Sequence, residues 1–344
     1  MGITATNITK SADGYTVVDN VSLEIADGDF AVILGPTGAG KTTLLRMLCG
    51  VERPTSGSIA YDGNDVTRVP TRKRSVAMVY QQFVNYPSLT VYENIASPLR
   101  LKRPRLSKKE IDVTVRETAE LVALSHVLDH LPAEVSGGQQ QRTAIARALA
   151  KGAKYFFLDE PLANLDFKLR EELRGELKRI FQDRGGAAIY ATPDPIDALS
   201  MATHVGVMRD GQLLQYGPAR AVYNTPANVR VAEYFSYPTM NLVEARVEHG
   251  ALRLSDDLSI PINGLAERIG RHVCRVGIRP HALRLADTAA NGSTFTARVE
   301  FSEVVGSDTE VFVSHGDLRF TALLDHVRRF NAGYRNAGDH FPYC

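Results

Sequence analysis

The chain has 344 residues, an apolar content of 44% and a formal net charge of +1. This length gives room for two domains, and the near-neutral charge offers no electrostatic case for binding nucleic acid. The N-terminus lacks an apolar signal segment, and no apolar stretch approaches the length of a membrane span. Cys49, Cys274 and Cys344 are isolated, without a metal-binding spacing or a disulfide framework. We therefore expect a soluble protein in a reducing cytoplasm.

The first elements lead to a glycine-rich loop. Residues 3–25 alternate between apolar and polar and predict an antiparallel strand pair, and Phe30–Leu34 predicts a buried strand. Residues 35–42 read Gly-Pro-Thr-Gly-Ala-Gly-Lys-Thr, and a helical pattern follows them. This is the phosphate-loop pattern of a P-loop NTPase. A glycine-rich turn that binds nothing is the alternative, and the strand before the loop and the Lys-Thr pair after it weigh against that alternative.

The residues of this loop have distinct expected roles. Glycines permit a tight turn and a close approach of phosphate oxygens to backbone N–H groups. Lys41 can reach the β- and γ-phosphates of a nucleotide, and Thr42 can offer its hydroxyl to Mg²⁺. The predicted nucleotide-binding residues of the loop are Gly35, Gly38, Gly40, Lys41, Thr42 and Thr43.

A helical segment follows the next apolar strand, Val76–Tyr80. Between about residues 91 and 131 the apolar positions recur at helical spacing, which predicts a helical subdomain inserted at about residues 87–150. A basic cluster lies within it, formed by Lys102, Arg103, Arg105, Lys108 and Lys109. The cluster is either a solvated loop and helix start or a contact for a membrane partner's cytoplasmic loops or for lipid headgroups.

A second possible anion cradle lies about a hundred residues after the first. Val135-Ser136-Gly137-Gly138-Gln139 precedes an alanine-rich helix, so backbone N–H groups at a helix N-terminus are available to an anion. An ordinary serine N-cap with flexible glycines is the alternative.

An acidic pair follows another apolar strand. Tyr155–Leu158 ends in Asp159 and Glu160. An aspartate at the end of a strand beside a phosphate loop is positioned to hold Mg²⁺, and the adjacent glutamate can orient or deprotonate the attacking water. Without the phosphate loop upstream, a surface carboxylate would be the better interpretation. An amphipathic helix at 168–181 and strands at 187–191 and 204–208 follow, and strands alternating with helices predict a largely parallel, doubly wound α/β sheet.

The pattern of apolar and polar residues changes after residue 235. Residues 236–241 read as a linker, and short alternating runs with glycine turns then predict a small β-barrel. We therefore expect a nucleotide-binding domain at 1–235 and a β-rich regulatory domain at 236–344. The polar ending, residues 331–344, lacks an expected final strand, which predicts incomplete closure.

Taken together, these motifs resemble the ATP-binding subunits of ABC transporters over roughly residues 3–330. Residues 135–139 are similar to the family signature, with Val135 in place of its usual leucine. The resemblance implies that Tyr15 stacks on adenine, that Gln81 contacts Mg²⁺ and the interface with the membrane domain, and that Asp166 is the D-loop aspartate. It also implies a head-to-tail dimer, in which ATP lies between the phosphate loop of one chain and the signature of the other, Ser136, Gly137, Gly138 and Gln139.

The C-terminal motif Val276-Gly277-Ile278-Arg279-Pro280 resembles the regulatory barrel of carbohydrate importers. The resemblance implies an ATP hydrolase for carbohydrate or polyol import at the cytoplasmic face of the inner membrane. Its partners would be permease subunits and a second ATPase subunit, with a solute-binding protein acting indirectly. Residues 78–87 and the missing switch histidine, described next, most resemble one of the two paired ATPase subunits of a glycerol importer. The rival is a non-transport ABC ATPase or an ATP-sensing module, but the long coiled-coil insertion and the second ATPase domain typical of such proteins are absent from the sequence.

One position departs from the family pattern. The family's switch histidine ends a strand, whereas this chain reads Ala191-Thr192-Pro193-Asp194 there. Pro193 has neither a side-chain donor nor a backbone N–H, so it cannot contact the γ-phosphate. We expect slow hydrolysis at this chain's own site and a heterodimer with a partner that keeps the histidine. The alternative is that Glu160 suffices alone.

Overall fold

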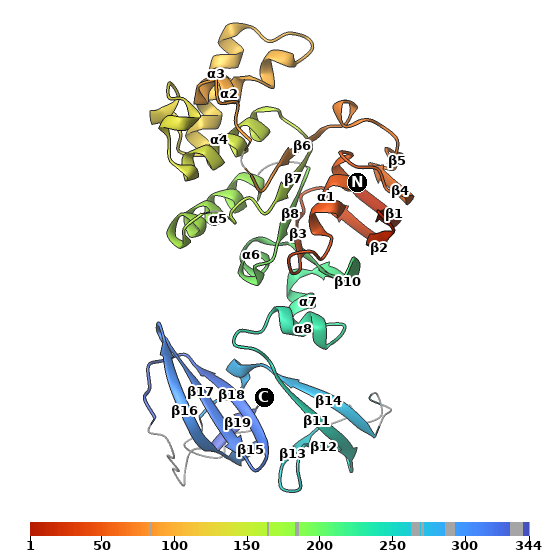
Figure 1. Ribbon diagram of the computed structural model, residues 1–344, viewed down its shortest axis with the longest axis vertical. Coiled ribbons are helices and arrows are strands. Elements are labelled where there is room, and N and C mark those ends of the chain that lie inside the picture. The colour runs from red at the N-terminus through yellow and green to blue at the C-terminus, as the bar shows by residue number, and fades with distance from the viewer. Residues whose placement is uncertain are drawn as a thin grey trace. The chain divides into compact units, whose positions relative to one another are not determined.

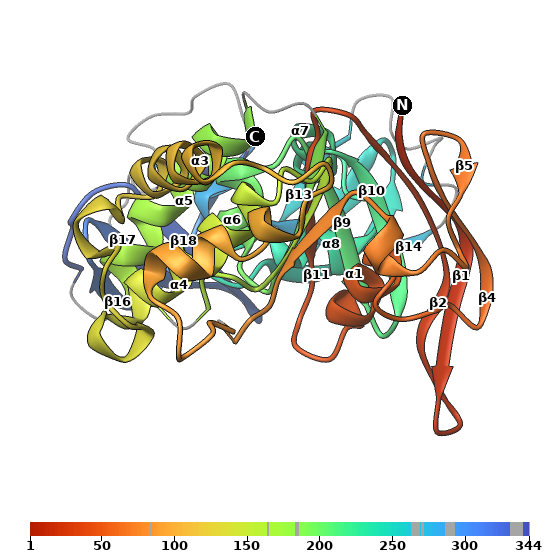
Figure 2. The same ribbon diagram turned by 90° about the horizontal axis from the view of Figure 1, so that it is seen from above.

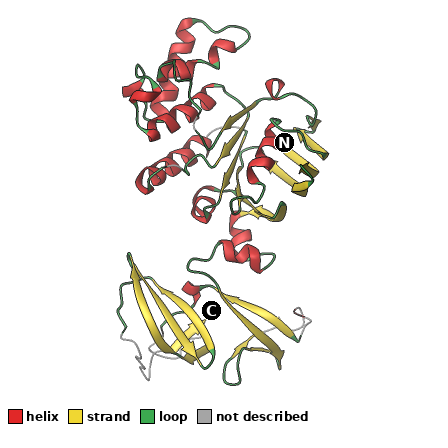
Figure 3. Cartoon of the chain, in the orientation of Figure 1, coloured by secondary structure: helices red, strands yellow, loops and turns green. Residues whose placement is uncertain are grey.

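The computed structural model describes residues 1–82, 84–163, 165–182, 186–262, 269, 272–285, 293–330 and 340–343. The chain divides into two compact units, Met1–Ala227 and Asn228–Cys344. Figure 3 shows helices and strands mixed in the first unit and mainly strands in the second. The sequence-based boundary at 235/236 falls just after helix α8 (Val229–Tyr234), which belongs to the second unit.

A six-stranded sheet forms the centre of the first unit (Figure 1). Its order is β10-β9-β3-β8-β7-β6, and every neighbouring pair is parallel except β10 with β9. The strands are β3 (Phe30–Leu34), β6 (Val76–Val79), β7 (Tyr155–Asp159), β8 (Ala187–Thr192), β9 (His204–Arg209) and β10 (Gln212–Pro218). Strands β3, β7 and β8 are buried along their whole length, as apolar runs covered on both faces should be. The predicted parallel sheet is confirmed.

An antiparallel sheet packs beside this centre. Its order is β2-β1-β4-β5, and β1 pairs with β2 as the alternating pattern predicted. The strands are β1 (Gly2–Ala12), β2 (Tyr15–Ala26), β4 (Ser56–Tyr61) and β5 (Asn64–Asp65). One apolar core joins the two sheets and helix α1 (Lys41–Cys49), with Ile3, Leu44 and Ile189 among its fully buried members. This packing holds α1, and therefore its N-terminus, against the end of β3.

The helical subdomain contains α2 (Val91–Ala96), α3 (Lys108–Leu121) and α4 (Gly137–Ala150). Each begins with a reciprocal capping box, made by Thr90, Ser107 and Ser136, which satisfies otherwise unpaired N–H groups. The remaining helices of the first unit are α5 (Phe167–Gln182), α6 (Pro195–Met201) and α7 (Ala219–Asn224). Within the described ranges no helix has the length and apolar character needed to cross a membrane.

The second unit consists of short antiparallel strands around its own apolar core. Three sheets have the orders β13-β12-β11-β14, β16-β17-β18 and β15-β19. The strands are β11 (Asn241–Glu248), β12 (Ala251–Arg253), β13 (Ser259–Pro261), β14 (Val273–Ile278), β15 (Ser293–Thr296), β16 (Arg298–Val305), β17 (Asp308–His315), β18 (Leu318–Leu324) and β19 (His340–Tyr343). The expectation that the ending lacks a final strand is wrong, because β19 pairs antiparallel with β15. The four-residue strand was missed since nothing in its short run shows an extended alternation.

Candidate active site

The loop at residues 35–40 joins β3 to α1 and has the backbone that phosphate binding requires. Gly38 and Gly40 have φ values of 84° and 96°, in the left-handed region that glycine adopts without steric cost. A Cβ atom at Gly35 would collide with the carbonyl oxygen of Met208, and one at Gly40 would lie 2.6 Å from the carbonyl oxygen of Val17. Glycine is therefore needed at Gly35 for packing and at Gly40 for both packing and conformation, and the N-terminus of α1 stays open to an anion.

Lys41, the first residue of α1, points back over this loop. Its ammonium group donates to the carbonyl oxygens of Gly35 at 2.9 Å and Pro36 at 3.0 Å and lies 3.1 Å from a carboxylate oxygen of Glu160. The side chain is only 3% exposed, so these acceptors offset the cost of burying the charge. A phosphate oxygen is a stronger acceptor than a carbonyl oxygen, so the same ammonium group suits a nucleotide phosphate.

Thr42 and Asp159 meet although 117 residues separate them in the sequence. The Thr42 hydroxyl donates to Asp159 Oδ1 at 2.8 Å, because α1 begins beside the carboxyl end of β7. Burial raises the pKa of Asp159, and the nearby Glu160 charge adds to this effect, whereas the bond from Thr42 opposes it. The Thr42 hydroxyl and the Asp159 carboxylate are both oxygen ligands of the kind that Mg²⁺ prefers. They fit a Mg²⁺ ion that takes its other ligands from phosphate and water. Among the described residues, no group of three or more His, Cys, Asp or Glu side chains is placed to hold a metal ion.

The raised pKa of Asp159 predicts a pH effect on the nucleotide-free chain. A carboxyl group whose pKa is higher in the folded state favours folding when protonated, so this contribution is lost as the pH rises above the ordinary aspartate range near 4. Asp159→Asn is expected to raise the melting temperature of the nucleotide-free chain at pH 7 and to flatten its pH dependence. The same change should lower Mg²⁺-dependent turnover by about 10²-fold or more. Calorimetric melting between pH 4 and pH 8, in wild type and variant, measures the change in melting temperature and in its pH dependence.

Glu160 follows β7 in an unusual backbone conformation. Its φ of 45° lies in the left-handed region, which non-glycine residues seldom adopt and which costs on the order of 1–3 kcal/mol. Its N–H donates to the carbonyl oxygen of Ala191 at 3.0 Å, which fixes the turn to the neighbouring strand β8. The Gln81 amide, just after β6, lies 3.5 Å from Glu160 Oε2. The structure thus brings Gln81, Lys41 and Glu160 to one sheet edge.

The signature residues form a separate surface. Ser136 caps α4 by accepting from the N–H of Gln139, and Gln139 reciprocates by accepting from the N–H of Ser136. A Cβ atom on Gly138 would meet the end of the Leu169 side chain, which would have to move, whereas a Cβ on Gly137 would meet no atom within 4 Å. Figures 1 and 2 both separate α4 from α1. Within the described residues, no hydrogen bond or ion pair joins residues 136–139 to the phosphate loop.

Three other predicted residues lie at different places around the loop. Tyr15 is 78% exposed at the start of β2, two residues before Val17, whose carbonyl oxygen faces Gly40. It therefore lies on the strand that borders the phosphate loop. Thr43 is half-buried in the first turn of α1. The Asp166 carboxylate accepts from the N–H of Leu169 at 3.0 Å at the start of α5. Asn164, in the same D-loop segment, lies outside the described residues.

Pro193 directly follows β8, next to the end of β7 that carries Glu160. Thr192 pairs with Leu34 and Ala191 with Asp159 across the sheet, so the position lies at the edge where the other site residues gather. A cavity of about 150 Å³ is lined by Glu160, Thr192, Pro193 and Arg170, among others. A proline ring therefore borders the space beside the carboxylate, where the family pattern has an imidazole.

An ion-pair cluster, several of whose members line this cavity, was missed by the sequence reasoning. Arg174 donates to Asp197 at 2.7 Å and 2.8 Å, and Asp197 also accepts from the hydroxyls of Thr192 and Tyr190 at 2.7 Å and 3.2 Å. Arg170 lies 3.7 Å from Asp194, and its buried Nε has no hydrogen-bond partner. The bonds of Thr192 and Asp194 to this cluster hold the loop on both sides of Pro193, and the proline side chain takes no part in them. Two arginines four residues apart on one amphipathic helix were its only sequence signal.

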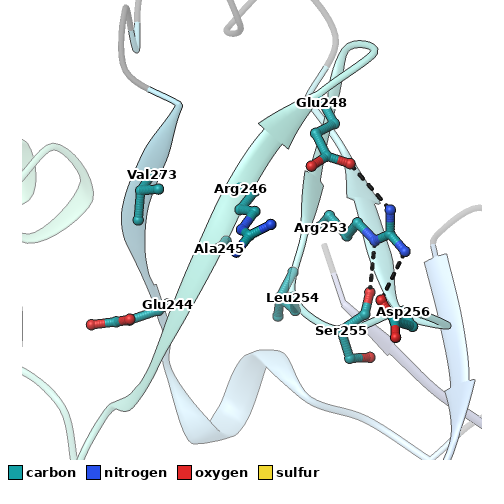
Figure 4. Close-up of a pocket in the computed structure, with 9 residues that line it drawn as sticks. All are labelled: Glu244, Ala245, Arg246, Glu248, Arg253, Leu254, Ser255, Asp256 and Val273. Atoms are coloured by element: carbon teal, nitrogen blue, oxygen red, sulfur yellow. Dashed lines mark hydrogen bonds and ion pairs between the residues drawn. The ribbon is translucent and has the colours of Figure 1, made fainter.

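The second unit contains a larger hollow, of about 510 Å³, on the solvent side of β11 and β12 (Figure 4). Arg253 in its wall is already paired with Glu248 at 3.2 Å and with Asp256 at 2.9 Å. Figure 4 shows these partners on either side of the guanidinium group. None of the predicted site residues lines this hollow.

Comparison with known proteins agrees with this geometry. The ABC transporter family model matches residues 18–163, and the TOBE domain model matches residues 276–340. The chain is 38% identical over 351 residues to the trehalose/maltose import ATP-binding protein MalK of Thermococcus litoralis, spanning 96% of this chain and 93% of that protein. It is 38% identical over 320 residues to the sulfoquinovosyl glycerol transport ATP-binding protein SmoE of Agrobacterium fabrum, spanning 92% of this chain and 88% of that protein.

It is also 36% identical over 335 residues to the sn-glycerol-3-phosphate import ATP-binding protein UgpC of Escherichia coli (strain UTI89), spanning 96% of this chain and 93% of that protein. A solved dimeric, post-hydrolysis state of the ATP-binding cassette MJ0796, bound to ADP and Pi, superposes with a TM-score of 0.58 and 30% identity. The match covers 63% of this chain and 99% of the chain in that structure.

The fold is that of a P-loop ATPase with an inserted helical subdomain. This chain belongs to the family of ABC transporter ATP-binding proteins, and its nucleotide is ATP. The family recognised in the sequence is thereby confirmed.

Proposed function

We propose that this chain hydrolyses ATP to power the import of a carbohydrate or polyol, as a peripheral subunit at the cytoplasmic face of the inner membrane. One observation carries the proposal: the likeness to import ATP-binding proteins extends over both units, including the TOBE domain. By their names, these relatives import trehalose/maltose and sn-glycerol-3-phosphate, which are all polyhydroxylated solutes.

The geometry gives each residue a role in hydrolysis. Backbone N–H groups of residues 35–42 and the Lys41 ammonium group would hold the β- and γ-phosphates. Thr42, Asp159 and Gln81 would hold Mg²⁺, which neutralises developing phosphate charge when bound. Glu160 would accept the proton of the attacking water, and Tyr15 would stack on adenine. A phosphate that binds the Lys41 ammonium group would compete with Glu160 for it, which would free Glu160 for the water.

Complete sites require a second ATPase subunit, of the same or a homologous kind. Ser136, Gly137 and Gln139 are exposed or half-buried on a surface that, within the described part of the chain, has no hydrogen bond or ion pair to this chain's phosphate loop. We infer that they serve the ATP held by the partner, together with Gly138 and the D-loop aspartate Asp166. Closure on ATP and opening after hydrolysis would pass to the permease through Gln81 and the helical subdomain.

Substitutions in the signature residues should lower ATP hydrolysis without changing ATP binding. Ser136→Ala or Gly137→Asp is expected to leave MgATP affinity of the isolated chain within about twofold and to lower ATPase activity of the assembled transporter by about 10²-fold or more. Calorimetry on the chain and phosphate release by the complex measure the two effects. Loss of ATP binding by the isolated variants would contradict the head-to-tail arrangement.

Pro193 supports a heterodimer. A homodimer would lack the histidine in both sites, whereas a partner that keeps it would form one fast site with this chain's Ser136 and Gly137. Failure of this inference leaves the importer function untouched, because Glu160 alone could then support turnover.

Affinity purification of the chain tests whether permease subunits are its partners. Tagged full-length chain, expressed in its own host and purified in mild detergent, is expected to retain membrane permease subunits, and a solute-binding protein only through them. Recovery of soluble partners without any permease would favour the rival, a non-transport ATPase or ATP-sensing module. Nucleic acid is not an expected partner.

The transported solute is proposed more finely as glycerol, from residues 78–87 and the missing histidine. Uptake of labelled glycerol, glycerol-3-phosphate and maltose in cells with and without the gene distinguishes the candidates. Loss of maltose uptake with glycerol uptake unchanged would overturn the refinement and leave the importer function standing.

A further inference from the structure

The segment at residues 100–109 concentrates positive charge on one exposed edge. It contains Arg100, Lys102, Arg103, Arg105, Lys108 and Lys109, and no acidic residue occurs between Asn94 and Lys109. Removing these six charges from the formal net +1 of the chain leaves −5. The segment, here called the basic loop, is therefore opposite in sign to the rest of the molecule. Figure 1 shows the connection between α2 and α3 at the outer end of the helical subdomain, away from the central sheet.

Two of the six cations have local structural roles. Arg100 lies 4.0 Å from Glu93. Lys102 extends toward the turn after α4, where its Nζ would lie 3.4 Å from a Cβ placed on Gly152. A cation near the C-terminal end of a helix is favourable because the helix dipole is negative there. These two residues need no external partner.

The other four cations have no such role. Arg103, Arg105, Lys108 and Lys109 are exposed, and none forms an ion pair or side-chain hydrogen bond in the described part of the chain. The nearest acid along the chain, Glu110, is engaged with Ser107 in the capping box of α3.

Helix stability does not explain the two lysines of this group either. Lys108 and Lys109 occupy the first turn of α3, where the helix dipole disfavours positive charge. The same loop carries Leu101, which is 82% exposed. An apolar side chain beside unpaired cations suits the boundary between lipid headgroups and acyl chains.

We propose that the basic loop docks on anionic phospholipid headgroups of the membrane, with Arg103, Arg105, Lys108 and Lys109 supplying charge and Leu101 inserting. Clusters of four to eight Lys or Arg residues bind anionic leaflets, at about fivefold in affinity per residue. A protein partner would need acidic groups fixed opposite each of these cations, whereas a fluid anionic leaflet supplies headgroups that can move to meet them. The surface would orient the ATPase on the membrane beside its permease and requires no nucleotide.

Vesicle sedimentation with the full-length chain tests the proposal. The wild-type chain is expected to bind vesicles of phosphatidylglycerol and phosphatidylcholine, but not phosphatidylcholine alone, and to dissociate in about 0.5 M salt because exposed charges are screened. The quadruple variant Arg103→Gln, Arg105→Gln, Lys108→Gln, Lys109→Gln should bind at least about a hundredfold more weakly. Leu101→Ser should weaken binding further without changing the salt dependence.

A matched control removes four exposed cations elsewhere on the same unit: Arg53→Gln, Arg68→Gln, Arg72→Gln, Lys73→Gln. It has the same net charge as the test variant and should bind vesicles within about threefold of wild type. Equal loss in both variants, binding to neutral vesicles, or binding only to vesicles that contain permease would each overturn the proposal. Lys41→Ala should still bind vesicles, so failure here is distinguishable from failure of the ATPase assignment. Thermal melting confirms that each variant is folded.

Discussion

Lys41→Ala is expected to weaken MgATP binding by on the order of a hundredfold. The change removes the buried ammonium group that now bonds to Gly35 and Pro36 and pairs with Glu160. A hydrogen bond to a charged group contributes about 1.5–3 kcal/mol, and phosphate oxygens would lose at least one. Titration calorimetry of the full-length chain with MgATP measures the loss.

Lys73→Ala is the matched control, because Lys73 is an exposed lysine of the same unit outside the phosphate loop. It should leave affinity unchanged. Unaltered affinity in a folded Lys41→Ala variant would refute the phosphate-loop assignment, whereas weakened affinity in both variants would point to a general effect of charge.

Pro193→His is expected to raise the slow ATPase rate of the purified chain by about 10²-fold. The imidazole would enter the space beside Glu160 and donate to the transferring phosphate, which proline cannot do. The loop should tolerate the change, because its neighbours on both sides are held by hydrogen bonds. The Thr192 hydroxyl donates to Asp197, and Asp194 accepts from the N–H of Ile196 as the N-cap of α6. Steady-state phosphate release at saturating MgATP measures kcat.

Pro193→Ala provides the comparison, because it removes the ring without adding a donor and should stay slow. Glu160→Gln combined with Pro193→His should abolish the gain. Robust turnover of the unmutated chain, lost in Glu160→Gln alone, would show that the histidine is dispensable and would remove the reason for a heterodimer.

Much of the site was determined by short stretches of sequence. The phosphate loop combines φ-positive glycines with Lys41 and Thr42 at a helix start, so its chemistry can be read from eight consecutive residues. The capping box of Ser136 and the strand that ends in Asp159 are likewise local, because capping and strand termination depend on neighbours in the chain. The parallel sheet followed from buried apolar runs separated by amphipathic helices.

Tertiary structure decided which of these pieces meet. The 2.8 Å bond from Thr42 to Asp159, the 3.1 Å pair of Lys41 with Glu160 and the position of Pro193 depend on strand order β3-β8-β7, in which the last strand along the chain lies in the middle. The pairing of β19 with β15 and the cluster of Arg174 with Asp197 also join distant segments. Local propensity does not encode such contacts, since they form only when burial of both sheet faces selects one topology.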